Sequence, residues 1–473
     1  MVIHRNSKKR FIVSATTFFS CFAVLITKTF LDMAFEIDPQ TIRDLELFND
    51  KPDGKSIFSF FNRTQTFGGK LQLKGLMQSP LDNMEELHRR SGIIRFFMHQ
   101  GFTLPINSSQ MDFIDHYFRV NKTVLKPNSI DGYFQKHFVR QNNKNDQYLI
   151  ETGIEKMIFL LLALTGTLEK IPKIKVPVSL RQYFSLIQNY LDKPEIKAML
   201  KELGPKPRKI KHYRYDYLFR HKYLLETRDL VKTIYLFDAF NAVAQTAISH
   251  QLCLADYSES PLPQLTITQL FHPFLEKPVR NSISTKAHQN ICFLTGPNMA
   301  GKSTFLKSLG LAIYLAHLGF PVPATSMKTP IYKGLSTTIN LPDDMGLGYS
   351  HFYSEVNRIK DVALHIQQKK QVFVIFDELF RGTNVKDAYE ASLAVLEAFS
   401  CIKGSTFFIS SHILEVAEKL HENNSILFRY FDASLKDQKL HYTYQLCKGI
   451  SHERLGMYIL QRESVIDILR SLK

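Results

Sequence analysis

Residues 296–304, Gly-Pro-Asn-Met-Ala-Gly-Lys-Ser-Thr, constrain the fold of this chain more than any other stretch. They place glycine, lysine and serine at the spacing of a phosphate-binding loop. The apolar run 291–295 before them predicts a buried strand, and the apolar spacing over 304–318 predicts a helix. A loop between a strand and a helix can present backbone N–H groups and a positive helix end to phosphates. The segment therefore predicts an α/β fold and a phosphate ligand.

Two side chains of this loop have specific expected roles. Lys302 would reach the β- and γ-phosphates of a nucleotide, and Ser303 would bind Mg²⁺. A chance match is the alternative, and the strand and helix expected on either side argue against it. The predicted ATP-binding residues are Gly296, Pro297, Asn298, Met299, Ala300, Gly301, Lys302, Ser303 and Thr304.

Two further predicted strands end in residues suited to hydrolysis. Residues 371–376 form a continuous apolar run before Asp377 and Glu378, which is typical of a parallel strand covered by helices on both faces. Asp377 is placed to hold Mg²⁺, through water, and Glu378 to polarise an attacking water. A third strand at 406–409 ends near His412. His412 is a candidate for sensing the γ-phosphate or orienting water, although a lone histidine is more often structural.

The composition indicates a folded protein with a polyanionic partner. The 473 residues are 44% hydrophobic and 22% charged, which suits two or three domains with full cores. The net charge of +16 favours nucleic acid or an anionic membrane surface. The five cysteines are scattered without a C-x-x-C pair, which argues against a disulfide framework or a zinc site and for a reducing, cytoplasmic location.

One basic stretch between 206 and 222 is interleaved with tyrosine and phenylalanine. Its lysines and arginines could contact DNA phosphates. The sequence equally allows the alternative of a solvated helix face with the aromatic rings turned inward. The candidate DNA contacts are Lys206, Arg208, Lys209, Lys211 and Arg214.

The chain divides into three parts by pattern. Residues 1–32 are a basic and then apolar extension; we expect translation to start at Met33, with a membrane anchor as the alternative. Residues 33–258 are expected to be mostly helical, and 259–473 to alternate strands and helices around a parallel sheet. Pro261 and Pro263 mark the boundary. The finer expectations are helices over 84–98, 153–168, 179–191 and 228–251, loops over 122–131 and 204–211, and a hairpin of 425–431 with 439–446.

The motifs together resemble the MutS family of mismatch-repair ATPases. The Asn298-Met299 pair is distinctive of its phosphate loop, and Asp377-Glu-Leu-Phe-Arg-Gly-Thr383 is similar to its Walker B segment and dimer-contact loop. Ser411-His412 resembles its Thr-His switch pair. Further resemblances are Asp343-Asp344 with 348–355 (signature segment), His272-Pro273 (start of the ATPase domain), 278–281 (adenine pocket), 444–456 (closing strand and helix), and, more weakly, 37–81 (start of the core domain).

The resemblance implies a P-loop ATPase of the ABC type that works as a dimer, expected here to be a homodimer, with ATP and Mg²⁺ as cofactors. The signature segment of one subunit would complete the nucleotide site of the other, with Ser350 donating to the partner's γ-phosphate. The residues carried over for these roles are Ser350 and Glu355 in the signature segment and Arg381, Gly382, Thr383 and Asp387 in the dimer-contact loop.

The departures from the family pattern qualify this expectation. The resemblance begins near residue 35, so we expect the mismatch-recognition domain to be absent and the DNA clamp to be shortened. Ala300, Phe380 and Ala388 stand where the family usually has glycine, and Ser411 replaces threonine. The bulk of Phe380 is expected to alter the subunit contact.

The function implied is a DNA-binding ATPase that couples ATP binding and hydrolysis to the engagement of mismatched or branched double-stranded DNA. The process would be mismatch repair or recombination, with a repair protein as a further partner. One alternative is a membrane-associated ATPase anchored by 11–31. Another is an ATPase directed at a protein partner without direct mismatch recognition, or an interaction protein in which ATP serves only as a conformational switch. The complete Asp377-Glu378 pair argues against that last class.

Overall fold

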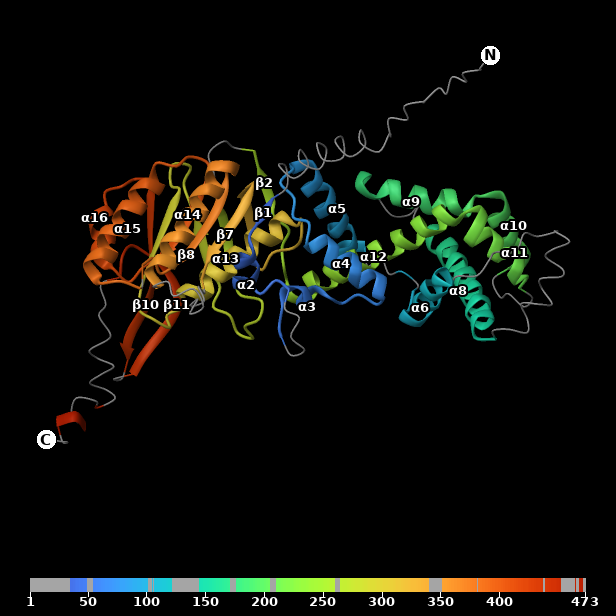
Figure 1. Ribbon diagram of the computed structural model, residues 1–473, viewed down its shortest axis with the longest axis horizontal. Helices are drawn as coiled ribbons and strands as arrows, with labels where there is room; N and C mark the ends of the chain where they lie inside the picture. Colours follow the sequence, from blue (N-terminus) through green and yellow to red (C-terminus); the bar gives the residue numbers. More distant parts are fainter. Residues whose placement is uncertain are drawn as a thin grey trace, which may run out of the picture.

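The protein combines an α/β region at one end of its long axis with a helical region at the other (Figure 1). This arrangement confirms the expected mixture of helices and a mostly parallel sheet. The structure is a computed structural model, and it describes residues 35–48, 54–100, 104, 106–120, 144–170, 176–204, 210–259, 264–339, 351–380, 382–436, 439–451, 464 and 468–470.

The helical region is organised around its longest helix, α12 (Leu224–His250), against which α4, α5 and α9 pack. Aromatic rings fill the contact: Phe97 and Phe184 meet Phe237 at centroid distances of 5.6 and 5.5 Å. Such rings bury a large apolar area, so they stabilise the packing of helices from distant parts of the sequence. The other elements are α3 (Ile57–Phe61), α4 (Phe67–Met77), α5 (Met84–Gln100), α6 (Ser108–Arg119), α8 (Lys144–Leu168), α9 (Val178–Leu191), α10 (Pro194–Leu203), α11 (His212–Tyr217) and the π-helix η2 (Leu218–Lys222).

The periodicity of the sequence locates these helices well. The helices expected over 84–98, 153–168, 179–191 and 228–251 are confirmed as α5, α8, α9 and α12. Only α8 begins much earlier than expected, at Lys144, because 144–152 has few apolar residues to mark the helix. The expected loop 122–131, most of 204–211 and the boundary prolines Pro261 and Pro263 lie outside the described residues.

The α/β region is built on a seven-stranded sheet with the order β1-β7-β8-β9-β5-β10-β11. Neighbouring strands from β1 to β10 are parallel, and β10 and β11 form an antiparallel hairpin. The expected central strands and the hairpin are therefore confirmed. The strands are β1 (Glu36–Ile37), β5 (Ile291–Thr295), β7 (Gly334–Thr338), β8 (Val372–Asp377), β9 (Thr406–Ser410), β10 (Ile426–Lys436) and β11 (Lys439–Lys448).

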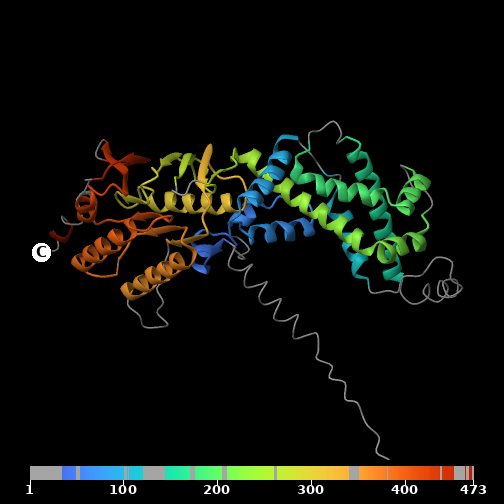
Figure 2. The same cartoon turned by 90° about the horizontal axis from the view of Figure 1, so that it is seen from above.

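Helices cover both faces of this sheet (Figure 2, where α13 is yellow and α14 and α15 are orange). Alternate residues of one strand point to opposite faces, so Phe373 packs in the core that contains α13 (Lys302–His317), whereas Val374 packs in a second core. The second core is completed by α14 (His351–Lys369), α15 (Val385–Ser400) and α16 (Leu414–Leu420). Burial on both faces explains why these strands are apolar throughout.

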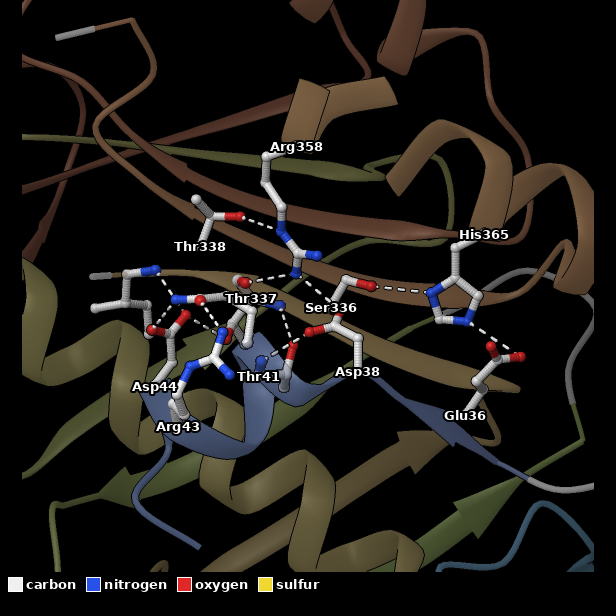
Figure 3. Close-up of polar contacts among 12 residues, drawn as sticks. Glu36, Asp38, Thr41, Arg43, Asp44, Ser336, Thr337, Thr338, Arg358 and His365 are labelled. Atoms are coloured by element: carbon white, nitrogen blue, oxygen red, sulfur yellow. Dashed lines mark hydrogen bonds and ion pairs between the residues drawn. The ribbon is translucent and has the colours of Figure 1, made fainter. Parts of the chain in front are cut away.

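The segment after residue 34 belongs to the sheet, although the sequence pattern groups it with the helical part. Glu36 and Ile37 pair in parallel with Gly334 and Leu335 of β7. Helix α2 (Pro39–Asp44) follows and packs on β7. Asp44 accepts the Thr337 hydroxyl at 2.8 Å (Figure 3). This pairing is non-local, so helical periodicity could not reveal it.

Polar contacts attach the same segment to α14 (Figure 3). Arg358 of α14 pairs with Asp38 at 2.8 Å and donates to the Thr337 carbonyl at 2.8 Å. His365 lies 2.9 Å from the Ser336 hydroxyl and 4.0 Å from a carboxylate oxygen of Glu36. An open cleft of about 510 Å³ runs along this contact. The first described strand and helix are thus bound to both β7 and α14.

A second sheet has four strands in the order β2-β6-β3-β4 and mixed directions. Its β4 contacts β11, so it supports the hairpin side of the large sheet. The strands are β2 (Asp256–Ser258), β3 (Thr266–Leu270), β4 (Asn281–Ser284) and β6 (Ser326–Pro330).

The carboxyl end of α13 joins the two regions. The Tyr314 hydroxyl donates to the Met77 carbonyl of α4, and Arg90 of α5 donates to the Leu318 carbonyl at 3.0 Å. His317 is fully buried, with Nδ1 2.8 Å from the Leu81 carbonyl and its ring stacked on Phe35 at 4.2 Å. The helix that starts at the glycine-rich loop therefore ends against the helical region.

No helix in the described part of the chain is both long and apolar enough to cross a bilayer. The extension 1–32, with its candidate anchor 11–31, lies outside the described residues.

Candidate functional site

The candidate site lies at the carboxyl edge of β5, β8 and β9, which are adjacent in the order β8-β9-β5. All three strands are parallel, so the residues that follow them meet at one edge of the sheet. Ligands of open α/β sheets bind outside this edge. The sequence candidates after 295, 377 and 410 are therefore brought together by the topology.

The loop 296–301 connects β5 to α13 with several residues in the left-handed backbone region. Gly296 has φ of 131° and Gly301 has φ of 106°, values that glycine adopts without strain. A Cβ atom at Gly296 would lie 2.6 Å from the Phe431 carbonyl oxygen, so only glycine fits there. Met299 has φ of 66° and is 81% exposed. The chain thus turns sharply and presents the amino end of α13 at the sheet edge.

Lys302 is the first residue of α13 and is held at the loop. Its ammonium donates to the carbonyls of Gly296 and Pro297 at 2.7 and 3.1 Å. The residue is only 5% exposed, whereas Ser303 and Thr304 are exposed. A buried ammonium at a helix amino end adds positive charge to that of the helix dipole. This end of α13 is suited to an anion.

Asp377 ends β8 and is 7% exposed. The Ser410 hydroxyl at the end of β9 donates to its Oδ1 at 2.6 Å and accepts the Glu378 N–H at 2.9 Å. Glu378 has φ of 63°. A non-glycine residue in this left-handed conformation has a strained backbone, and such strain is often found at functional sites. The two carboxylates are therefore fixed where β8 ends.

The Glu378 carboxylate contacts the candidate histidine. His412 Nε2 donates to Glu378 Oε1, and the two side chains are 39% and 14% exposed. The preceding Ser411 donates its N–H to the Leu294 carbonyl of β5 at 3.1 Å. The loop after β9 thus lies between the glycine-rich loop and the carboxylate pair.

An aromatic residue that the sequence reasoning did not assign to the site lies beside the loop. A Cβ atom at Gly301 would be 3.4 Å from the ring of Tyr444, which belongs to β11 and has φ of 55°. Asn281 of β4 holds the backbone just after this tyrosine, donating to the Tyr444 carbonyl at 2.9 Å and accepting the Leu446 N–H at 2.8 Å. Residues 278–281, expected near an adenine pocket, are therefore linked to the loop by Tyr444. No local signal marks this contact, because the hairpin follows the loop by more than a hundred residues.

The residues carried over for a subunit contact are only partly described. Ser350 and Arg381 lie outside the described residues, and Glu355 is buried in α14. Gly382 is exposed, and Asp387 is exposed in the first turn of α15. Thr383 is half-buried, and the Asp387 N–H donates to the capping Asn384 side chain at 3.0 Å.

The three residues that replace family glycines have different surroundings. Phe380 is 5% exposed and its ring packs on Phe352 of α14 at 5.5 Å. Ala300 is fully buried and Ala388 is 4% exposed. The side chain of Phe380 therefore fills the second core rather than a surface of the described chain.

The described basic residues between 211 and 222 form ion pairs. Lys211 and Arg214 contact Glu202 at 2.6 and 3.5 Å. Arg220 contacts Asp216 at 2.6 Å, and both side chains are nearly buried. Tyr215 and Phe219 are fully buried, as the alternative of a solvated helix face predicts, whereas Tyr213 is 49% exposed. Lys206, Arg208 and Lys209 lie outside the described residues, and the contact of this stretch with DNA stays a prediction.

The donor chemistry at the sheet edge suits a hard divalent cation. Ser303 offers a hydroxyl oxygen and Asp377 a carboxylate oxygen, the ligand types that Mg²⁺ prefers alongside water and phosphate. The thiol of Cys292, which lies within β5, is not a competing ligand, because burial raises its pKa to about 12 and keeps it protonated. Ser303 and Asp377 therefore fit a magnesium ion better than a thiolate-seeking metal.

Comparison with known proteins gives a consistent picture. The family profile described as MutS domain V matches residues 292–468. A human protein named MutS protein homolog 4 is 31% identical over 256 residues, which are 51% of this chain and 27% of the human protein. Its mouse counterpart is 32% identical over 256 residues, 51% of this chain and 26% of the mouse protein. DNA mismatch repair protein MutS of Lactobacillus acidophilus is 26% identical over 246 residues, 51% of this chain and 28% of that protein. The chain covers 26–28% of the length of these curated relatives.

Proposed function

Since this chain belongs to the MutS family, we propose that its α/β region binds and hydrolyses ATP and couples this reaction to the engagement of double-stranded DNA. The observation that carries the proposal is the convergence at one sheet edge of the loop ending in Lys302, the Asp377-Glu378 pair and His412. Members of the family are ATPases. The name of the Lactobacillus acidophilus relative refers to DNA mismatch repair.

In the proposed reaction, the loop N–H groups and Lys302 hold the β- and γ-phosphates of ATP. Bound through Ser303 and Asp377, Mg²⁺ would neutralise charge on those phosphates. Glu378 accepts the proton of the water that attacks the γ-phosphorus, and the bond to the β-phosphate oxygen breaks. His412 keeps the Glu378 carboxylate oriented through their hydrogen bond. Tyr444, beside Gly301, offers an aromatic surface for the base.

We further propose that two copies of the chain act together. Ser350 of one copy would donate to the γ-phosphate held by the other, and residues 382–387 at the start of α15 would form part of the contact. ATP would close the pair and hydrolysis would reopen it. Helix α13 starts at the loop and ends against α4 and α5, so its movement would be passed to the helical region.

The proposed DNA ligand is a mismatched or branched duplex, in mismatch repair or recombination. The net charge of +16 supports a polyanionic partner. The ion pairs of Lys211, Arg214 and Arg220 mean that this stretch would have to exchange protein carboxylates for phosphates. An ATPase directed at a protein partner is the second candidate, because those internal pairs reduce the support for DNA binding by this stretch.

The test is ATP turnover by the full chain at fixed, near-physiological salt. Turnover is measured without DNA and with perfect duplex, mismatched duplex and a four-way junction. Salt is held constant because phosphate-driven binding varies steeply with it. We expect the mismatch or the junction to change turnover more than perfect duplex does. If none of these DNAs changes ATP turnover, the DNA role is excluded. The remaining candidate is then an ATPase directed at a protein partner. Absence of turnover would exclude the enzyme.

A further inference from the structure

Ser410 links the two carboxylate residues of the site through a single hydroxyl. It is the last residue of β9, is paired in register with Asp377, and has no exposed surface. Its Oγ donates to Asp377 Oδ1 at 2.6 Å and accepts the Glu378 N–H at 2.9 Å. A hydroxyl can donate once and accept twice, so this one group constrains two consecutive residues of the neighbouring strand.

The first contact occupies one oxygen of the Asp377 carboxylate, Oδ1. An O–H···O⁻ bond of this length is of the strong, charge-assisted kind. Because Oδ1 accepts the hydroxyl of Ser410, Oδ2 is the oxygen that Asp377 would offer to a metal-bound water. Asp377 is 7% exposed and its carboxylate is hydrogen-bonded to Ser410, so rotation of the side chain is restricted before any ligand binds.

The second contact fixes the peptide of Glu378. This residue has φ of 63°, a conformation that costs free energy for a non-glycine residue unless neighbouring groups stabilise it. The bond from its N–H to Ser410 supplies such support. It also sets the direction in which the Glu378 side chain leaves the backbone, toward His412.

We propose that Ser410 is a positioning residue for ATP hydrolysis, setting the metal-holding oxygen of Asp377 and the water-activating carboxylate of Glu378 relative to each other. The inference rests on the proposed function and adds a residue to it. Ser410 has no exposed surface through which it could contact a nucleotide. Its effect passes through the two carboxylates.

The same strand pair contains a matched control at its opposite end. Ser405 is also fully buried and also bridges β9 to β8: its Oγ accepts the Val372 N–H and donates to the Lys370 carbonyl, both at 3.1 Å. Ser405→Ala and Ser410→Ala therefore remove the same atom and each removes one donated and one accepted hydrogen bond, although only Ser410 donates to a carboxylate. Only the second lies at the carboxyl edge.

The experiment compares the full chain with Ser410→Ala, Ser410→Thr and Ser405→Ala. Melting temperature, ATP turnover, and ATP affinity with Mg²⁺ and with EDTA are measured for each. We expect Ser410→Ala to lower turnover about tenfold, as for loss of one charge-assisted bond. Its affinity for ATP should fall in Mg²⁺ and stay unchanged in EDTA. Ser410→Thr, which keeps the hydroxyl, should recover most of the turnover, and Ser405→Ala should lower the melting temperature alone.

Two outcomes overturn the role of Ser410. One is equal turnover in Ser410→Ala and Ser405→Ala. The other is an equal fall of ATP affinity with and without Mg²⁺, which would mean a general loss of structure. Absence of turnover in the unmodified chain would instead exclude the proposed hydrolysis. The Mg²⁺ dependence of ATP affinity would then still decide whether Ser410 orients Asp377.

Discussion

Charged residues that the sequence predicts to be functional lie in two places, at the carboxyl edge of the large sheet and in the basic stretch of the helical region. Their contacts differ between the two places. At the sheet edge, the charged groups converge from strands far apart in sequence. In the helical region, Lys211, Arg214 and Arg220 are bound to carboxylates of α10 and α11. Convergence favours an external ligand, whereas internal pairing favours a role in stability.

The difference shows what a charge pattern alone can mean. A cation that already has a carboxylate partner must give up that partner before it binds phosphate, so its net gain on binding is reduced. At the sheet edge, the Glu378 carboxylate contacts His412, which is itself a candidate site residue rather than a member of a separate structural pair. The two regions can be separated experimentally, because substitutions should affect turnover in one and stability in the other.

The largest expected effect is at the sheet edge. Glu378→Gln should lower ATP turnover by about a thousandfold, since an amide cannot accept the proton of the attacking water. ATP binding should persist. Steady-state turnover and nucleotide affinity are the measurements, with Glu390→Gln on the exposed side of α15 as the control. Turnover at the level of the control would remove Glu378 from the reaction.

The next effect is on stability in the basic stretch. Asp216→Ala should lower the free energy of unfolding by about 3 kcal/mol, because Arg220 would be left nearly buried without its carboxylate. Tyr117 would lose its hydrogen-bond acceptor as well. Glu202→Ala, which breaks the exposed pair of Lys211, should cost under about 1 kcal/mol. Urea unfolding measures both, and equal losses would contradict the distinction between buried and exposed pairs.

A third prediction concerns the joint between the two regions. Burial, with a smaller contribution from the nearby charge of Lys333, lowers the pKa of His317 to about 4, although the bond to the Leu81 carbonyl opposes the shift. The ring is neutral, since the Tyr332 N–H donates to its Nε2. The folded-state pKa lies below the unfolded value, so this stabilisation is full above pH 6.5 and is lost as pH falls toward 4. At pH 5 about 2 kcal/mol should be gone.

Unfolding in urea at pH 7 and pH 5 checks this prediction against a variant. His317→Asn keeps an N–H donor for the Leu81 carbonyl and cannot titrate. Its stability should therefore change less between the two pH values than that of the unmodified chain. Identical pH dependence in both proteins would show that His317 is not responsible.

The smallest expected effect tests whether the basic stretch contacts DNA at all. Lys211→Ala should change stability by less than about 1 kcal/mol. If the stretch does bind duplex, the slope of log affinity against log salt should fall by about 1. Fluorescence anisotropy of a labelled duplex at several salt concentrations measures the slope. Lys197→Ala, which breaks another exposed pair on α10, is the control, and a slope unchanged in both variants would place the DNA surface elsewhere.

The sequence predicts correctly those features that depend on interactions between residues close together in the chain. The strand 291–295, the loop and the start of α13 are set by neighbouring residues, so spacing alone locates them. The two-sided burial of β8 is likewise visible in its uninterrupted apolar run. Long helices such as α12 are marked by their periodicity.

The features that the sequence did not reveal depend on residues far apart in the chain. Ser410 became informative only when β9 placed it opposite Asp377. Tyr444 reaches the loop through a hairpin, and Glu202 reaches Lys211 across a helix junction. No spacing rule connects such residues, because their contacts depend on strand order and helix packing.

The pairing of β1 with β7 has a consequence for how the chain is made. Glu36 and Gly334 are neighbours in the sheet, so the strand at Glu36 leaves the ribosome long before the strand with which it pairs. Contacts of such long sequence separation form slowly. We expect the edge at β1 to be acquired last in refolding, and pulse-labelled hydrogen exchange should then protect the β8 and β9 amides before that of Ile37. Early protection of Ile37 would show that this end of the sheet instead helps to nucleate it.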